Sequence, residues 1–234
     1  IGDFVKRFSR QVLISLTLLF AAPVIASEAI NISSQPVINT QDAIKDLQRL
    51  LGEVKSFSAR FVQQTRNGLG EVLQSIKGQM EVQKPGKLRW QTEGVYEQLV
   101  VSNGEALWIY DADLEQVSIK DMNNRLAETP ALLLGGDVSA IESDFIVSQQ
   151  HSDSQLIFIL QPKDTSQLFD SLELAFNKLA QSQVLQQMII RDASGQLTEI
   201  QFSDAVNNPK LDAKLFTFDI PAGIDVIDGR QGRF

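Results

Sequence analysis

Residues 56–83, SFSARFVQQTRNGLGEVLQSIKGQMEVQ, decide the fold. On both sides of Asn67-Gly68, small or apolar residues alternate with polar ones, and this set is Phe57, Ala59, Phe61, Ile76, Gly78, Met80 and Val82. A period of two is typical of a strand with one buried face, and Asn-Gly is a preferred hairpin turn. The stretch therefore predicts two strands, 56–66 and 71–83, joined by a hairpin.

Similar short strand patterns follow one another along the chain, separated by turn signals such as Pro85-Gly86 and Asn103-Gly104. The further predicted strands are 87–92, 97–102, 105–110, 115–120, 144–149, 155–161, 171–177, 184–192, 196–205 and 214–219. Regularly spaced strands with short turns and few helices are typical of an antiparallel sheet. The sequence thus predicts a mainly β fold with some α-helix, in which the sheet curls into a barrel or half-barrel.

The N-terminal part of the chain predicts a targeting signal, a lead-in and a helix. Residues 1–26 place basic residues before an apolar stretch and end on small residues, which is typical of a cleaved secretory signal; an uncleaved anchor is the alternative. Residues 27–40 are polar and mixed, and predict a flexible lead-in. In residues 41–54 apolar positions recur every three or four residues, which indicates an amphipathic helix.

A second, short helix is expected at residues 129–135. Thr129 suits the capping position, Pro130 the first turn and Gly135 the end of this helix. Three adjacent residues sweep about 200° of a helix, and here they are Leu132, Leu133 and Leu134. Either the helix is buried on two sides, or part of it meets an apolar ligand or partner.

Composition excludes several classes of function. The chain has 234 residues, a net charge of −8, no cysteine and one histidine. The acidic balance argues against a nucleic-acid or anionic-membrane surface. Without cysteine there is no disulfide, no thiolate metal site, no cysteine nucleophile and no cysteine-linked lipid.

Candidate catalytic residues are few. His151 lies in a polar stretch between two predicted strands, which indicates a solvated loop histidine. Asp111, Asp113 and Glu115 resemble the start of a calcium loop, but the loop's glycine and final carboxylate are missing, so we expect an acidic turn and no metal. Some pair of carboxylates can still meet in space, which leaves a carbohydrate hydrolase open. By elimination, the sequence favours binding over catalysis.

Three segments in order carry a resemblance to a known family. They are QKPGKLRW at 83–90, LVVSNGEALWIYD at 99–111 and KLFTFDIPAGIDV at 214–226. With the signal segment, the two predicted helices and FSARF at 57–61, the chain resembles the periplasmic outer-membrane lipoprotein carrier family, LolA. The match covers residues 41–227 and leaves 228–234 as a C-terminal tail.

The resemblance implies an unclosed, strongly curved antiparallel β half-barrel covered by a helical lid. It implies a monomeric periplasmic chaperone that is not an enzyme and uses no cofactor. Such carriers take triacylated lipoproteins from an inner-membrane ATP-driven release complex and deliver them to an outer-membrane lipoprotein acceptor. The acceptor family shares the fold but is lipid-anchored, so the missing cysteine favours the carrier. A sensing domain of the same fold, without transfer activity, is the alternative.

The resemblance also implies site residues. Lys84 stands where family members carry a basic residue that bonds a lid-helix carbonyl, so it is the expected lid latch. Ordinary sheet core and a solvated turn are the alternatives for these positions. The expected acyl-chain cavity and lid consist of Phe61, Leu88, Trp90, Trp108, Leu132, Leu133 and Leu134.

Overall fold

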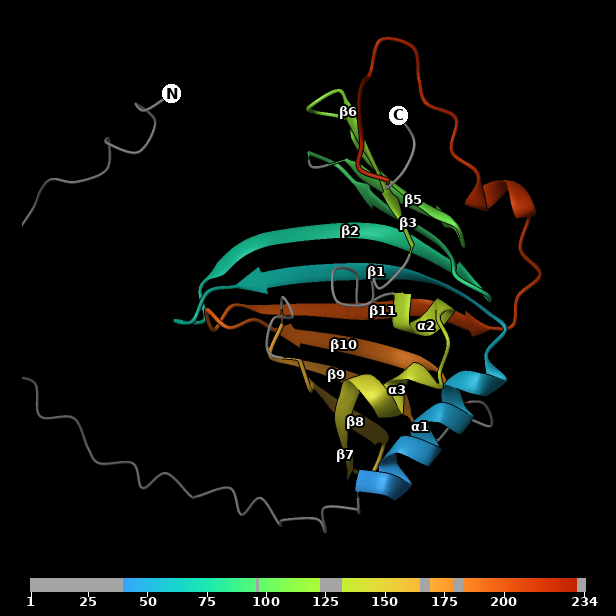
Figure 1. The fold of residues 1–234 in the computed structure, drawn as a ribbon. Helices are drawn as coiled ribbons and strands as arrows, with labels where there is room; N and C mark the ends of the chain where they lie inside the picture. The colour runs from blue at the N-terminus through green and yellow to red at the C-terminus, as the bar shows by residue number, and fades with distance from the viewer. Residues whose placement is uncertain (1–39, 96, 123–131, 165–168, 179–182, 231–234) are drawn as a thin grey trace, which may run out of the picture. The chain divides into compact units, whose positions relative to one another are not determined.

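One curved sheet and a few helices make up the part of the chain that the computed structural model describes, residues 40–95, 97–122, 132–164, 169–178 and 183–230 (Figure 1). Every described element belongs to one compact unit, Ser34–Phe234. The predicted signal segment and the lead-in up to residue 39 lie outside the described residues. Within the described ranges, no helix is long and apolar enough to cross a membrane.

The helices are short, apart from the first. They are α1 (Thr40–Glu53), α2 (Leu132–Gly135), α3 (Ala140–Asp144) and the 3-10 helix η2 (Ala213–Phe216). The strands are β1 (Ser56–Arg66), β2 (Val72–Gln83), β3 (Lys87–Glu93), β4 (Gln98–Asn103), β5 (Ala106–Asp111), β6 (Gln116–Asp121), β7 (Phe145–His151), β8 (Gln155–Pro162), β9 (Ser171–Asn177), β10 (Leu185–Arg191), β11 (Leu197–Asn207) and β12 (Asp225–Asp228).

In the described residues, these strands form one sheet in the order β12-β6-β5-β4-β3-β2-β1-β11-β10-β9-β8-β7. The two edge strands, β12 and β7, do not pair with each other, so the sheet is unclosed, as predicted. Neighbouring strands are antiparallel except β12, which is parallel to β6. The described sheet is thus antiparallel, as predicted, apart from this short edge strand.

Apolar residues at alternate positions along the strands give the sheet an apolar concave face. Paired residues share a face, and the pairs Ala59–Met80, Met80–Trp90 and Trp90–Val100 place one apolar row across β1 to β4. The row of Phe158, Leu174, Met188 and Ile200 continues this face across β8 to β11. Both rows join the buried residues of α1 and α2 in one hydrophobic cluster. The core therefore lies between the concave face and the helices.

The C-terminal segment differs from the prediction. Residues 214–219 were expected to form a strand, but Ala213–Phe216 is a 3-10 helix whose first turn is capped by the Asp212 carboxylate, which accepts a hydrogen bond from the Lys214 N–H. The Phe216 ring is 1% exposed, and η2 packs against β3 and β4. Capping and the docking of one aromatic ring thus prevail over strand propensity. The last strand is instead β12, whose residues are all exposed.

The other predicted strands are confirmed, with ends within two residues of those expected. Helix α1 begins at Thr40, one residue before its predicted start. Helix α2 includes Leu132 to Gly135, while the predicted capping residues Thr129 and Pro130 lie outside the described residues. Helix α3 was not predicted, because its five residues are too few to show a helical period.

Candidate functional site

Two aromatic rings lie stacked on the concave face. Phe61 of β1 and Trp90 of β3 have ring centroids 3.9 Å apart and planes inclined by 26°. Phe61 is 2% exposed, and Trp90 is partly buried against the core cluster. Between their strands runs β2, so the two rings meet across an intervening strand. The concave face therefore has a flat aromatic surface near its middle.

Gly78 of β2 makes this contact possible. It is the strand partner of both Phe61 and Thr92, so it lies beneath the Phe61 ring. A Cβ at this position would lie 2.4 Å from Phe61 Cζ and 2.1 Å from the Gln91 carbonyl oxygen. The absence of a side chain thus lets the ring lie across β2.

Helix α2 covers the neighbouring part of the concave face. Leu133 and Leu134 are 3% and 5% exposed and belong to the same hydrophobic cluster as Leu88, which is fully buried. The helix contacts β2 and β3 closely, because a Cβ at Gly135 would lie 3.1 Å from Val82 Cγ1. The short helix thus packs as a plug against the sheet, with both described leucines buried. The side chain of Leu132 lies outside what the structure describes.

Lys84 links the sheet to the end of α1. Its Nζ donates a 2.7 Å hydrogen bond to the carbonyl oxygen of Leu51, in the last turn of the helix. Carbonyls of a last turn have no partner within the helix, and a cation there also interacts favourably with the helix dipole. Lys84, which the family resemblance implied as a latch, thus forms a hydrogen bond between the β2–β3 turn and the last turn of α1.

The environment of Lys84 disfavours the charged form of its side chain. Burial lowers the pKa of Lys84, and the nearby cation of Lys55 lowers it further, while Asp137 opposes both effects. The Asp137 carboxylate is fully exposed, and hydrogen bonds from Ser139 are the main cause of its lowered pKa. A lysine that is partly desolvated and bonded to one carbonyl has lost hydration that it regains on leaving this position. Burial therefore offsets part of the stabilisation that the hydrogen bond to Leu51 provides.

The turn that carries Lys84 also holds α2. The Gly86 N–H donates a 2.8 Å hydrogen bond to the Gly135 carbonyl at the end of α2. The Gly86 carbonyl in turn accepts a 2.8 Å hydrogen bond from Ser102 Oγ of β4, and Ser102 is fully buried. One turn between β2 and β3 therefore binds both α1 and α2. We call these two helices together the helical lid. Ser102 positions the turn that holds them.

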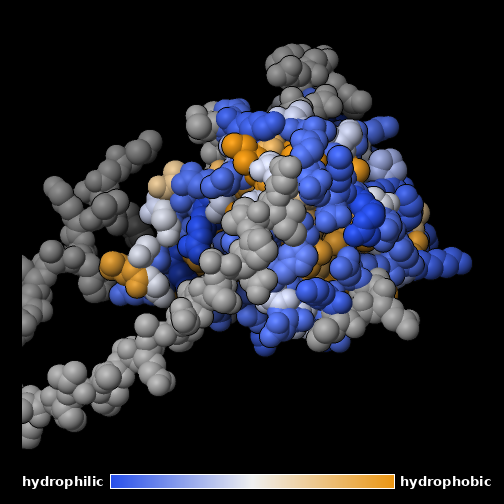
Figure 2. Space-filling model, turned by 90° about the horizontal axis from the view of Figure 1, so that it is seen from below, coloured by the Kyte–Doolittle hydropathy of each residue, from blue (hydrophilic) through white to orange (hydrophobic). Residues whose placement is uncertain are grey.

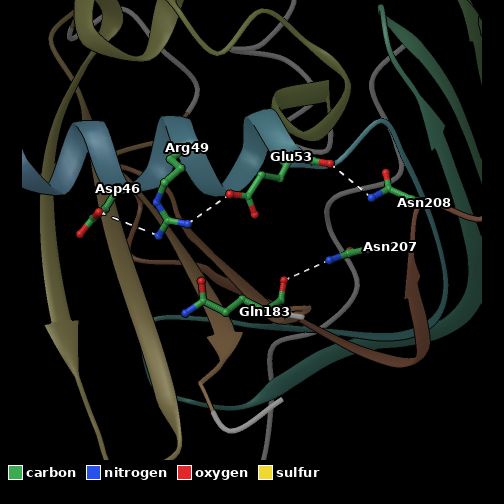
Figure 3. Close-up of polar contacts among 6 residues, drawn as sticks. All are labelled: Asp46, Arg49, Glu53, Gln183, Asn207 and Asn208. Carbon is green, nitrogen blue, oxygen red and sulfur yellow. Dashed lines mark hydrogen bonds and ion pairs between the residues drawn. The ribbon is translucent and has the colours of Figure 1, made fainter. Parts of the chain in front are cut away.

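Asn208, just after β11, fixes the other side of the α1 terminus (Figure 3). Its Nδ2 donates to the Glu53 carbonyl at 3.2 Å, and its Oδ1 accepts from the Lys55 N–H at 2.6 Å. Asn208 has φ +59°, a left-handed conformation that asparagine tolerates better than most residues. Along the helix, Arg49 bridges Asp46 and Glu53. These surface ion pairs stabilise α1 only slightly.

Trp108 does not join the expected cavity residues. It pairs with Val101 and Ile119, whereas the concave positions of the same strand are Leu107 and Ile109. The prediction that Trp108 faces the concave side is therefore wrong. Leu107, Trp108 and Ile109 are all apolar, so the sequence does not show which of them lie on the concave face. The strand pairing shows it.

His151 also differs from expectation. It is the last residue of β7, paired with Leu156, and it is half-buried, so its interpretation as a solvated loop residue is wrong. Strand β7 extends two residues beyond its predicted end because the β7–β8 hairpin turns later.

The acidic turn is confirmed: Asp111 Oδ1 accepts hydrogen bonds from the N–H groups of Asp113 and Leu114. No cluster of metal-ligating side chains exists among the described residues.

Sequence reasoning missed the residues that position the site. Gly78 fits the alternation of its strand, although a glycine inside a strand also signals close approach of another group. Ser102 and Asn208 carried no signal, since serine and asparagine beside a turn are ordinary. Only the tertiary contacts show that they support the lid.

Seen from below, the surface is mostly hydrophilic with scattered apolar patches (Figure 2). The concave face is apolar and lies beneath α1 and α2, whose buried residues share its hydrophobic cluster. An unclosed, curved sheet whose apolar concave face is covered by helices defines the structural class of the protein.

Comparison with known proteins identifies the family. The family model for the outer membrane lipoprotein carrier protein LolA matches residues 52–219. An outer-membrane lipoprotein carrier protein of Pseudomonas paraeruginosa is 44% identical over 185 residues, covering 79% of this chain and 87% of the relative. That of Azotobacter vinelandii is 39% identical over 204 residues, covering 87% and 97%. The chain belongs to the LolA family of outer-membrane lipoprotein carrier proteins.

A solved structure agrees on the fold. An uncharacterized conserved protein from Thermus thermophilus is 10% identical, with a TM-score of 0.50, and the alignment covers 81% of this chain and 99% of that one. At this identity the likeness concerns the fold alone. The predicted class, an unclosed curved β sheet with few helices, is confirmed.

Replacing Gly78 tests the aromatic stack. We expect Gly78→Ala to lower the free energy of unfolding by about 1–3 kcal/mol, because the new methyl group overpacks the Phe61 ring. The near-ultraviolet circular dichroism of the stacked rings should weaken as well. Gly52→Ala in α1 is the control, since a Cβ there meets nothing within 4 Å, and alanine favours a helix by up to about 1 kcal/mol. Equal effects of the two substitutions would show that the close approach is unimportant.

The lowered pKa of Lys84 gives a pH dependence. The folded protein releases this proton at lower pH than the unfolded chain does, so between the two pKa values the unfolded state binds more protons and stability rises with pH. We expect the unfolding free energy of the wild type, measured relative to Lys84→Leu, to increase as the pH rises toward the ordinary lysine pKa of about 10.4. Denaturant titrations of both proteins at each pH measure this difference. A constant or decreasing difference would contradict it.

Proposed function

We propose that this protein is a periplasmic lipoprotein chaperone that binds the acyl chains of its cargo on the concave face and delivers the cargo to an acceptor. Family membership supports this function, since the relatives are named outer-membrane lipoprotein carrier proteins. The donor is an inner-membrane ATP-driven release complex, and the recipient is an outer-membrane lipoprotein acceptor. The protein itself carries out no chemical reaction.

One structural observation supports the proposal above the others. The lid residues Leu51, Leu133 and Leu134 share one hydrophobic cluster with the concave-face residues Phe61 and Leu88. Lid and cargo therefore compete for the same apolar surface. When the lid moves away, acyl chains can replace its leucines without leaving that surface in water.

The energetics allow both capture and release. An acyl chain gains about 0.8 kcal/mol for each buried CH₂ group, so several chains in a perfectly matched cavity would approach the practical limit of affinity. Release would then be too slow, because affinity is mostly expressed in the dissociation rate. Closing the lid regains part of the same burial, which lowers the net affinity for cargo. A competing lid therefore suits a carrier that must also deliver.

The binding function is tested by displacement of a probe. The purified protein is loaded with an apolar fluorescent dye and titrated with a synthetic triacylated lipopeptide, and we expect loss of the bound-dye signal. The same peptide without acyl chains is the control and should displace nothing. If the triacylated peptide leaves the dye bound, the carrier function is wrong. Displacement without later transfer to vesicles bearing the acceptor would instead support a sensing domain.

Lys84→Leu tests the latch. The substitution removes the hydrogen bond to Leu51 and so destabilises the closed lid, which should favour the loaded carrier by about tenfold. Lipoprotein-bound carrier should accumulate, and transfer of radiolabelled lipoprotein to acceptor-bearing vesicles should fall.

Lys55→Leu is the matched control for the latch. Lys55 Nζ bonds the Gly52 carbonyl within the same short segment, so its loss removes a similar charge without freeing α1 from the sheet. We expect transfer by this variant to stay near that of the wild type. Unchanged transfer by Lys84→Leu would remove Lys84 from the mechanism.

A further inference from the structure

The concave face contains a buried hydrogen-bond acceptor for which the described part of the chain offers no donor. Gln149 of β7 is 1% exposed, and its Oε1 has no hydrogen-bond partner among the described residues. Leaving a buried acceptor without a donor costs about 1–3 kcal/mol, and most buried polar groups in native proteins are paired. A leucine of similar size would avoid this cost, so the amide needs an explanation.

The surroundings of Gln149 place it on the proposed ligand-binding surface. It pairs with Phe158, which belongs to the apolar row that also contains Leu174 and Met188. The Phe158 ring meets the Phe176 ring edge-on at 5.9 Å. An acyl chain lying along this row would therefore bring whatever group it is attached to within reach of Gln149.

A second unpartnered polar atom lies close by. His151 follows two positions later on the same strand and thus faces the same side, roughly 7 Å away. Its Nε2 is also buried without a partner in the described ranges. Two such atoms at one end of an otherwise apolar row form a small polar subsite, built into edge strand β7.

Helix α1 packs against the strand that carries this subsite. The helix packs against β7, and its residues share the hydrophobic cluster with Val147 and Phe158. Moving the lid away from the sheet would therefore expose the apolar row that Gln149 adjoins through its partner Phe158.

We propose that Gln149 recognises the amide linkage of an N-acyl chain, with its Oε1 accepting the hydrogen bond of the amide N–H. This rests on the proposed function, since it concerns which part of an acylated cargo occupies the surface. The chemistry of the linkages gives the selectivity. An ester offers only acceptor oxygens, whereas an amide also offers the donor that Oε1 lacks.

Two ligands that differ by one atom test the proposal. N-Hexadecanoylglycine methyl ester carries the amide, and methyl hexadecanoyloxyacetate has an oxygen in place of the N–H. Both are titrated against the dye-loaded protein, and the ratio of their dissociation constants is measured. We expect the wild type to bind the amide about three- to tenfold more tightly, the gain from one net hydrogen bond.

Gln149→Leu should abolish this preference while leaving binding of the ester ligand unchanged or stronger. Gln149→Met is a second variant of similar volume, in case the first fails to fold, and circular dichroism checks both. Gln150→Leu is the matched control, because the neighbouring glutamine is exposed on the opposite face. It should retain the wild-type ratio.

The outcomes separate this proposal from the carrier function. If both ligands displace the dye equally, or the ester binds more tightly, the role of Gln149 is wrong while the carrier function stands. The role is also wrong if the preference persists in Gln149→Leu and Gln149→Met. If neither ligand displaces the dye from the wild type, the carrier function fails, and the proposal fails with it.

Discussion

The apolar concave face constrains everything else in this molecule. A sheet that curls without closing gathers the inward residues of β1 to β4 and β8 to β11 around one interior, and that interior needs a cover. The amphipathic face of α1 and the two buried leucines of α2 provide it. The rest of the structure positions that cover: the turn at Lys84 and Gly86 on one side, and Asn208 on the other.

The aromatic stack shows how closely the sheet is fitted to this interior. Phe61 reaches Trp90 only because the strand between them has no side chain at Gly78. A stacked pair of rings is flat and presents a continuous apolar surface without filling the space above it. Under the proposed function, this surface would accept either a leucine of the lid or an acyl chain, because neither has to match a deep and specific pocket.

Much of this fold could be predicted from the sequence, and the failures have physical reasons. Strands with one polar and one apolar face show a period of two, so the hairpin at residues 56–83 was confirmed. Trp108 was misplaced because β5 is apolar on both faces, and only the pairing with Val101 assigns it. Phe216 was placed in a strand because local propensity does not report a docking site on β3 and β4. Strand β12 was missed because its four exposed residues acquire their partner only through the tertiary fold.

Among the site residues, family resemblance indicated Lys84, but neither pattern nor resemblance indicated Gly78, Ser102 or Gln149.

The attachments of the lid are polar and few, and their strength is small compared with the burial they control. Each neutral hydrogen bond, such as Gly86 to Gly135, contributes about 0.5–1.5 kcal/mol net, while an acyl chain with about fifteen CH₂ groups gains roughly 12 kcal/mol on burial. These bonds therefore cannot by themselves exclude cargo, and most of the opposition to binding is the apolar surface that the lid buries when closed. The bonds instead determine the position of the closed lid on the sheet. Because Lys84 and Gly86 belong to one turn, α1 and α2 are held over the same part of the sheet, above the surface that the cargo would occupy. A change at this turn would therefore act on both helices at once and leave the apolar residues of the sheet in place.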